Sequence, residues 1–207
     1  KLLFKYISKN CYTRYNENFS EMRRFCADQR EINTETFYLS INKILNTIWI
    51  LKPEIKNDIQ ESIRKKIPEN IKYIAIHIRR GDKITSKEDK KYEVNEYIDQ
   101  VLKLNSKINV IFLMSDDYNS YIELKKKFPK FEIITFLNDT KSGFDERHFK
   151  SLSKNNIKSE TIQFLTEIEI AKKSTYFIGS FKSNVFRLVQ YFKLDNCIDI
   201  SRTKKPL

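Results

Sequence analysis

Glycine is scarce in this chain of 207 residues, which contains three glycines, at positions 81, 143 and 179. They lie too far apart to form the GxGxxG or Walker A loops with which many proteins hold phosphate groups. An anionic ligand would therefore have to be held by arginine, by lysine or by the N-terminus of a helix.

Cysteine and histidine are also few. Cys11, Cys26 and Cys197 show no CxxC spacing, and they do not group with His77 and His148 as a metal site would. The pattern therefore predicts no bound metal and favours buried thiols, with a Cys11–Cys26 disulfide left open for a secreted protein.

Long apolar runs are missing as well. No stretch approaches the roughly 18 apolar residues of a membrane span, and no signal peptide is recognisable. We therefore expect no membrane span in this chain and favour a cytoplasmic protein. The chain begins at Lys1, and a truncated start would leave the secretory pathway open.

Positive charge is in excess, with 39 Lys and Arg against 27 Asp and Glu and a net charge of +12. An excess of this size raises the alternative of a nucleic-acid-binding protein. The lysines, however, alternate with acids, as in Lys52–Asp58 and Lys87–Lys90, and this mixture is typical of a solvated basic surface. We therefore expect no nucleic-acid partner.

The pattern of apolar residues changes near residue 70. Before it, Thr36–Leu51 and Pro53–Ile67 have helical spacing, and Pro53 and Pro68 end these two helices. After it come short apolar runs at Ile71–Ile78, Ile108–Met114, Phe131–Phe136, Thr175–Gly179 and Cys197–Ile200. Helical stretches lie between them at Asn95–Lys103, Tyr118–Lys127, Ser159–Lys172 and Asn184–Lys193.

Strands that alternate with helices predict an α/β fold, namely a Rossmann-like parallel sheet with helices on both faces. We expect two parts, an α-helical N-terminal segment at 1–70 and the Rossmann-like domain at 71–207. The long polar connection Leu137–Lys158 is either a mobile substrate loop or a surface excursion. In such sheets the ligand lies outside the carboxyl ends of the strands.

Charged side chains follow the first predicted strand. Arg79, Arg80, Asp82 and Lys83 form a cationic cluster there, in which the aspartate orients one guanidinium and the other binds phosphate. The alternative is a surface salt-bridge cluster. Because the cluster lies where this fold places a ligand, we favour a functional site.

Two more strand ends are polar. Asp116 and Asp117 follow the second strand, either as helix caps or as groups that contact a sugar hydroxyl or the arginine pair. Ser180 and Ser183 follow the strand Thr175–Gly179 at the start of a helix, either as plain caps or as a phosphate site. The three ends together are cationic and rich in hydroxyl groups, which matches a nucleotide diphosphate.

These residues resemble a known family. His77–Lys83 is similar to the HxRRxDK signature of α1,6-fucosyltransferases and their relatives, a looser form of which occurs in α1,2- and protein O-fucosyltransferases. Phe112–Asp117 and Ser180–Arg187 resemble the second and third motifs of the family, in the same order. The resemblance extends roughly from Phe37 to Phe192.

The resemblance implies a GT-B enzyme that uses GDP-fucose as donor and a glycan as acceptor, inverts the anomeric centre and needs no metal. It implies catalytic roles for Arg79, Arg80 and a nearby glutamate. It also implies a donor-binding set formed by His77, Arg79, Arg80, Asp82, Lys83, Asp116, Asp117, Glu167, Ser180, Ser183 and Asn184.

Several positions depart from the family pattern. The base falls one position late, at Glu88, because the loop Ile84–Tyr92 is one residue longer, and Lys87 occupies the equivalent position. Glu167 replaces an aspartate that helps to hold the nucleotide, and Asn184 replaces a glutamine. About 70 residues before the first motif are too few for a second Rossmann domain. The alternatives are therefore a related GDP-sugar transferase of another linkage or a non-catalytic nucleotide- or glycan-binding module.

Overall fold

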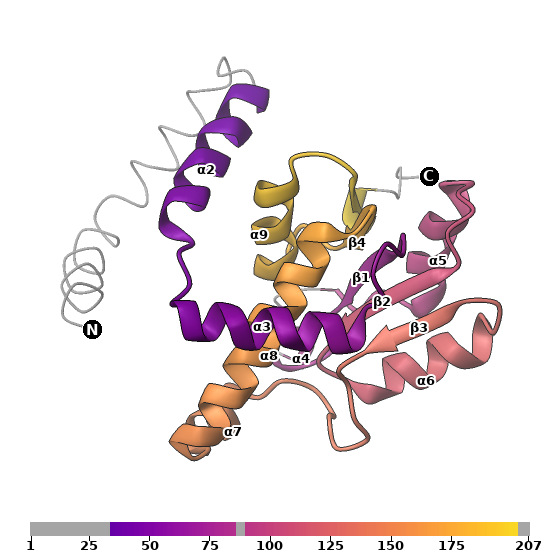
Figure 1. Cartoon of the computed structure of the whole chain (residues 1–207). Coiled ribbons are helices and arrows are strands. Elements are labelled where there is room, and N and C mark those ends of the chain that lie inside the picture. The colour runs from indigo at the N-terminus through magenta and orange to yellow at the C-terminus, as the bar shows by residue number, and fades with distance from the viewer. Residues whose placement is uncertain (1–33, 86–89, 203–207) are drawn as a thin grey trace. The chain divides into compact units, whose positions relative to one another are not determined.

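The computed structural model describes residues 34–85 and 90–202, and the chain divides into two compact units, 1–41 and 42–207 (Figure 1). Helix α2 (Thr34–Ile48) crosses the boundary between them. The second unit contains the sheet and every predicted site residue that the structure describes.

The second unit is built on a five-stranded parallel sheet, in the order β3-β2-β1-β4-β5. The strands are β1 (Ile74–Ile78), β2 (Val110–Ser115), β3 (Glu132–Thr135), β4 (Tyr176–Gly179) and β5 (Cys197–Asp199). Each lies within one of the predicted apolar runs or one residue beyond it. The predicted Rossmann-like α/β fold is confirmed.

Helices cover both faces of the sheet, because alternate side chains of each strand point to opposite sides. Ile74 and Ile76 of β1 pack in one core cluster, with residues of α5 (Val94–Lys103) and α6 (Tyr118–Lys127). Ala75 packs in the other, with residues of α3 (Pro53–Lys66), α8 (Lys154–Lys173) and α9 (Asn184–Lys193).

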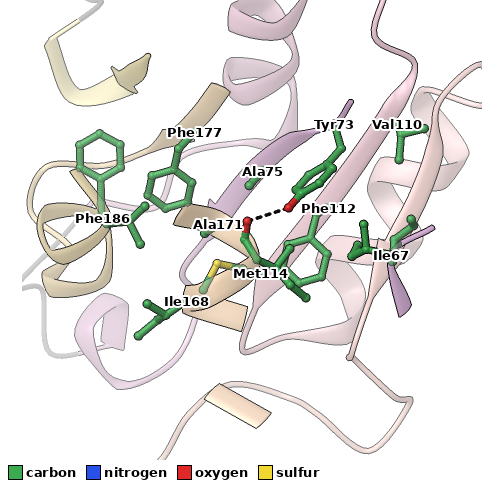
Figure 2. Packing of buried hydrophobic residues seen from close by; sticks show 13 residues of the cluster. Ile67, Tyr73, Ala75, Val110, Phe112, Met114, Ile168, Ala171, Phe177 and Phe186 are labelled. Carbon is green, nitrogen blue, oxygen red and sulfur yellow. Dashed lines mark hydrogen bonds between the residues drawn. The ribbon is translucent and has the colours of Figure 1, made fainter. Parts of the chain in front are cut away.

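The second core cluster fixes α8 on the sheet (Figure 2). Phe112 from β2 and Phe177 from β4 are fully buried there, and Phe177 stacks on Phe186 of α9 at a centroid distance of 5.4 Å. The hydroxyl of Tyr73 donates to the carbonyl oxygen of Ile170 in α8 at 2.9 Å. Helices α8 and α9 are therefore packed against this face of the sheet.

The segment before β1 belongs to the same unit as the sheet, which differs from the predicted boundary after residue 70. Helix α3 packs on α8. The indole Nε1 of Trp49 donates to Oε1 of Glu169 at 2.9 Å, and Lys172 pairs with the same oxygen at 2.8 Å. These contacts tie the chain from Asn42 onward to the sheet unit.

The connection between β3 and β4 holds more helix than predicted. Helix α7 (Glu146–Ser151) lies within it, and α8 begins at Lys154 rather than at Ser159. The side chains of Asp145 and Ser153 cap the two helices by accepting from backbone N–H groups at 2.8 and 3.2 Å. A short helix, α4 (Asp82–Thr85), was also not predicted. Across the described ranges, every helix is too short or too polar to cross a membrane.

Candidate functional site

The strand order places a topological switch point between β1 and β4, at the carboxyl edge of the sheet. From β1 the chain crosses to β2 and β3 on one side, whereas β4 and β5 lie on the other side of β1. Ligands bind at such a switch point, outside the carboxyl ends of the strands. Arg79 and Arg80 follow β1 there, and Ser180–Ser183 follow β4.

Asp116 organises the end of β1. Its Oδ1 accepts from the backbone N–H of Arg80 at 2.8 Å, and its Oδ2 accepts from Gly81 at 2.8 Å and from Phe144 at 3.2 Å. Its backbone carbonyl accepts from the N–H of Gly143 at 2.7 Å. Both carboxylate oxygens are thus engaged with backbone, so Asp116 fixes two loops against each other.

Two glycines allow these loops to approach closely. A Cβ on Gly81 would lie 2.4 Å from the nitrogen and 2.5 Å from the oxygen of Phe144. Gly143 has a φ of +110°, a conformation that side chains disfavour, and a Cβ there would lie 3.1 Å from the Cα of Gly81. The loop before α7 can therefore contact the end of β1 only with glycine at both positions.

Asp117 has the simpler of its two predicted roles. It is the N-cap of α6, and its Oδ1 accepts from the backbone N–H of Asn119 at 3.2 Å and from the Asn119 side chain at 3.1 Å. The helix-cap interpretation of Asp117 is confirmed, and its role at a nucleotide stays a prediction.

The Arg80 guanidinium is only partly satisfied. Its Nη1 donates to the carbonyl oxygen of Arg79 at 3.4 Å, which is long for a hydrogen bond. Its Nη2 is buried and has no hydrogen-bond partner among the described residues. A buried donor of a charged group without an acceptor is unfavourable, and an anion would relieve this. Arg79 is half-buried beside it.

Three predicted residues follow Arg80 closely in sequence. Asp82 and Lys83 form the first turn of α4, and nothing is described of their side chains. Glu88, the predicted base, lies outside the described residues. Their predicted roles therefore stay predictions.

His77 lies within β1 and is buried. Its pKa is lowered to about 4, chiefly by burial; the carboxylate of Asp116 opposes the shift, and the charge of Arg79 contributes to it. The imidazole is thus neutral at pH 7. Its Nδ1 is buried without a hydrogen-bond partner in the described part of the chain. A neutral imidazole has one donor and one acceptor nitrogen, so His77 can donate a hydrogen bond to an uncharged ligand group or accept one from it.

Ser183 stands at the N-terminus of α9 without capping it. It is the N-cap residue and is 3% exposed, yet its side chain makes no cap hydrogen bond. Its Oγ has no hydrogen-bond partner among the residues that the structure describes. The plain-cap alternative for Ser183 therefore does not apply, and its hydroxyl and the first N–H groups of α9 are suited to an anion.

Neighbours of Ser183 shape this turn. The carbonyl oxygen of Ser180 accepts from the N–H of Ser183 at 2.9 Å, and the Oγ of Ser180 accepts from the backbone N–H of Lys182 at 3.3 Å. Asn184 is exposed, and its side chain accepts from Arg187. Sequence reasoning missed Asp199, whose Oδ1 accepts from the N–H of Phe181 at 2.9 Å. Its position at the carboxyl end of β5 could have indicated Asp199 as a site residue.

Glu167 lies on α8 and is buried. Its pKa is raised to about 8, chiefly by burial; a hydrogen bond from Gln163 at 3.4 Å and the charge of Lys141 oppose the shift, and the charge of Glu160 contributes to it. The side chain is therefore largely protonated at pH 7, so it can donate a hydrogen bond to a ligand. Lys141 pairs with Glu160, which ties the loop after β3 to α8.

Glu167→Gln should flatten the dependence of stability on pH. Between pH 7 and 8 the unfolded chain has lost the Glu167 proton and the folded chain still holds it, so stability falls as pH rises, by at most about 1.4 kcal/mol per unit. His77 is neutral in the folded state and mostly neutral in the unfolded state in this range, and it contributes equally to wild type and variant. Urea denaturation at pH 7.0, 7.5 and 8.0 measures the effect. Equal slopes for wild type and variant would contradict the buried, protonated carboxyl.

A separate groove of about 640 Å³ lies between α3 and α8. It is lined by neither Arg80 nor Ser183, but Gln163 lines it and donates to Glu167. The anion site described above lies instead at the carboxyl ends of β1 and β4. In the described ranges, no group of three His, Cys, Asp or Glu side chains is arranged to hold a metal ion.

Comparison with known proteins identifies the family of the chain. The chain belongs to the α-(1,6)-fucosyltransferase family: the family model for the N- and catalytic domains of these enzymes matches residues 27–199. No curated protein gives a significant match.

Two solved structures are similar to the chain. One is the NodZ α-1,6-fucosyltransferase soaked with GDP-fucose, with 13% identity and a TM-score of 0.47 over 69% of this chain. The other is NodZ co-crystallised with GDP, with 15% identity and a TM-score of 0.44 over 70%. The chain covers 43% and 42% of those two chains, so it spans less than half of their length.

Proposed function

We propose that the protein transfers fucose from GDP-fucose to a glycan acceptor, with inversion at the anomeric carbon and without a metal ion. Membership of the family supports the reaction class. The observation that carries the proposal is a pair of buried polar groups without a hydrogen-bond partner among the described residues. They are Nη2 of Arg80 and Oγ of Ser183, at the ends of two neighbouring strands. The unit at 42–207 would be the donor-binding half of a GT-B enzyme.

The two groups suit a diphosphate. The guanidinium of Arg80 neutralises phosphate charge, and the N-terminus of α9 adds backbone N–H donors and a favourable helix dipole. When the bond between the sugar and the β-phosphate breaks, negative charge grows on GDP. Fixed donors at that position stabilise the leaving group, and this is the role that a metal ion has in other transferases.

The acceptor needs a base. In the proposed reaction an acceptor hydroxyl attacks the anomeric carbon from the side opposite the phosphate, and its proton passes to Glu88. The new carbon–oxygen bond forms as the bond to phosphate breaks, so the configuration inverts.

Turnover on an acceptor array tests the proposed reaction. The protein is incubated in EDTA with GDP-fucose, GDP-mannose or GDP-glucose, and products are detected by mass spectrometry, with NMR for the anomeric configuration. We expect transfer from GDP-fucose with inverted configuration. Faster transfer from another GDP-sugar would favour the related transferase, and GDP binding without any transfer would favour the binding module.

Ser183→Ala should weaken GDP binding by about three- to tenfold, because it removes one hydrogen bond from phosphate while the N–H groups of α9 stay in place. Calorimetric titration with GDP measures the change. Ser151→Ala removes a hydroxyl from an exposed serine of α7 and serves as the matched control. Equal affinities in the two variants would contradict a phosphate contact at Ser183.

A further inference from the structure

The loop before α7 brings an aromatic residue to the end of β1. The N–H of Phe144 donates to Oδ2 of Asp116, the same oxygen that accepts from Gly81. Gly81 has no side chain to separate it from Phe144, and Gly143 supplies the positive φ just before it. Two of the three glycines of the chain thus serve this one contact.

The Phe144 side chain is not part of the core. It is 40% exposed, and its ring contacts Phe149 of α7 at a centroid distance of 5.8 Å. A single exposed apolar residue is ordinary on a protein surface. Phe144 is unusual because its backbone, rather than core packing, holds it beside the residue that follows Arg80. The backbone of Phe144 is therefore fixed beside the end of β1, and its ring is exposed next to Phe149.

The proposed position of the phosphate groups suggests which part of the donor contacts the Phe144 ring. In a nucleotide diphosphate sugar, the sugar is bonded directly to the β-phosphate. Asp116 accepts from the backbone N–H groups of both Arg80 and Phe144, so a sugar bonded to phosphates that Arg80 holds would be within reach of Phe144. The guanidinium of arginine and the hydroxyl of serine bind phosphates by hydrogen bonds, whereas an exposed phenyl ring packs against carbon-bound hydrogen and methyl groups.

We propose that Phe144 contacts the sugar of the donor and favours a 6-deoxyhexose. This inference rests on the proposed function. A 6-deoxyhexose presents a methyl group where other hexoses carry a hydroxymethyl group, and burying that methyl against the ring is favourable. An apolar wall discriminates only moderately against an added hydroxyl, so Phe144 contributes a preference and not a strict selection.

The experiment compares two ligands that differ only in the sugar. Calorimetry in EDTA gives the affinities for GDP and GDP-fucose in wild type, Phe144→Ser, Phe144→Leu and Ile122→Ser. Ile122 lies on α6, is 46% exposed and serves as the matched control. We expect Phe144→Ser to weaken GDP-fucose binding about tenfold and GDP binding less than twofold. Phe144→Leu should weaken the binding of GDP-fucose about threefold, and Ile122→Ser should leave the affinity for both ligands unchanged.

Each other outcome has a meaning. Equal losses for GDP and GDP-fucose would place the ring at the nucleotide and overturn the inference, as would unchanged affinities or a wild type that binds GDP but not GDP-fucose. Wild-type protein that does not bind GDP would instead contradict the proposed function. Thermal denaturation of each variant checks folding, and Phe144→Leu tests the inference if the serine variant does not fold.

Discussion

Arg80→Ala should lower the affinity for GDP by about 100-fold. The guanidinium has one long hydrogen bond, to Arg79, and a buried Nη2 that finds no acceptor among the described residues. Hydrogen bonds to a charged group contribute roughly 1.5–3 kcal/mol, and close charge on the phosphates adds to this. Calorimetric titration of both proteins with GDP gives the ratio.

A charge-matched control separates this contact from the general basic surface. Arg64→Ala removes an exposed arginine from α3 and changes the net charge equally. We expect its affinity for GDP to stay within about twofold of wild type, because an exposed charge is screened by salt. If both variants lose affinity equally, GDP binds through the overall charge and not through Arg80.

Asp116→Ala should lower the free energy of unfolding by about 3–5 kcal/mol and also weaken GDP binding. The substitution removes the acceptor of three backbone N–H groups, those of Arg80, Gly81 and Phe144. Bonds to a carboxylate contribute roughly 1.5–3 kcal/mol each, and water replaces part of the loss at a half-exposed site. Urea denaturation measures the stability.

The neighbouring carboxylate provides the comparison. Asp117→Ala removes one helix cap and should cost about 1 kcal/mol, with little change in GDP affinity. An Asp116→Ala protein as stable as Asp117→Ala would contradict the role assigned to Asp116. If it were destabilised as expected but bound GDP normally, the loops that it joins would not position Arg80.

The sheet could be predicted from the sequence because its strands are short, β-branched apolar runs between helical stretches. Helix α7 and the first turn of α8 were missed, since single cap residues, Asp145 and Ser153, mark their starts within a polar segment. The contact between α3 and α8 was missed as well, because helical periodicity shows that a face is apolar and not what covers it.

Some residues of the candidate site could be predicted from the sequence and others could not. Arg80 and Ser183 were predictable, because both follow strands whose carboxyl ends a parallel sheet brings together. For Asp116, a contact with the arginine pair was one of the predicted alternatives, and its bond to the backbone N–H of Arg80 agrees with it. Its bond to Phe144, 28 residues away in the chain, could not be predicted from local spacing. Glu167 emerged only through the family resemblance, because nothing in its local spacing indicates a buried carboxyl.

The most direct test of the account is a calorimetric titration of the wild-type protein with GDP in EDTA. The account predicts saturable 1:1 binding that does not change when magnesium or manganese is added, and that falls about 100-fold in Arg80→Ala. Absence of binding in EDTA, or binding that appears only when a divalent metal is added, would contradict an anion site built from Arg80 and the N-terminus of α9.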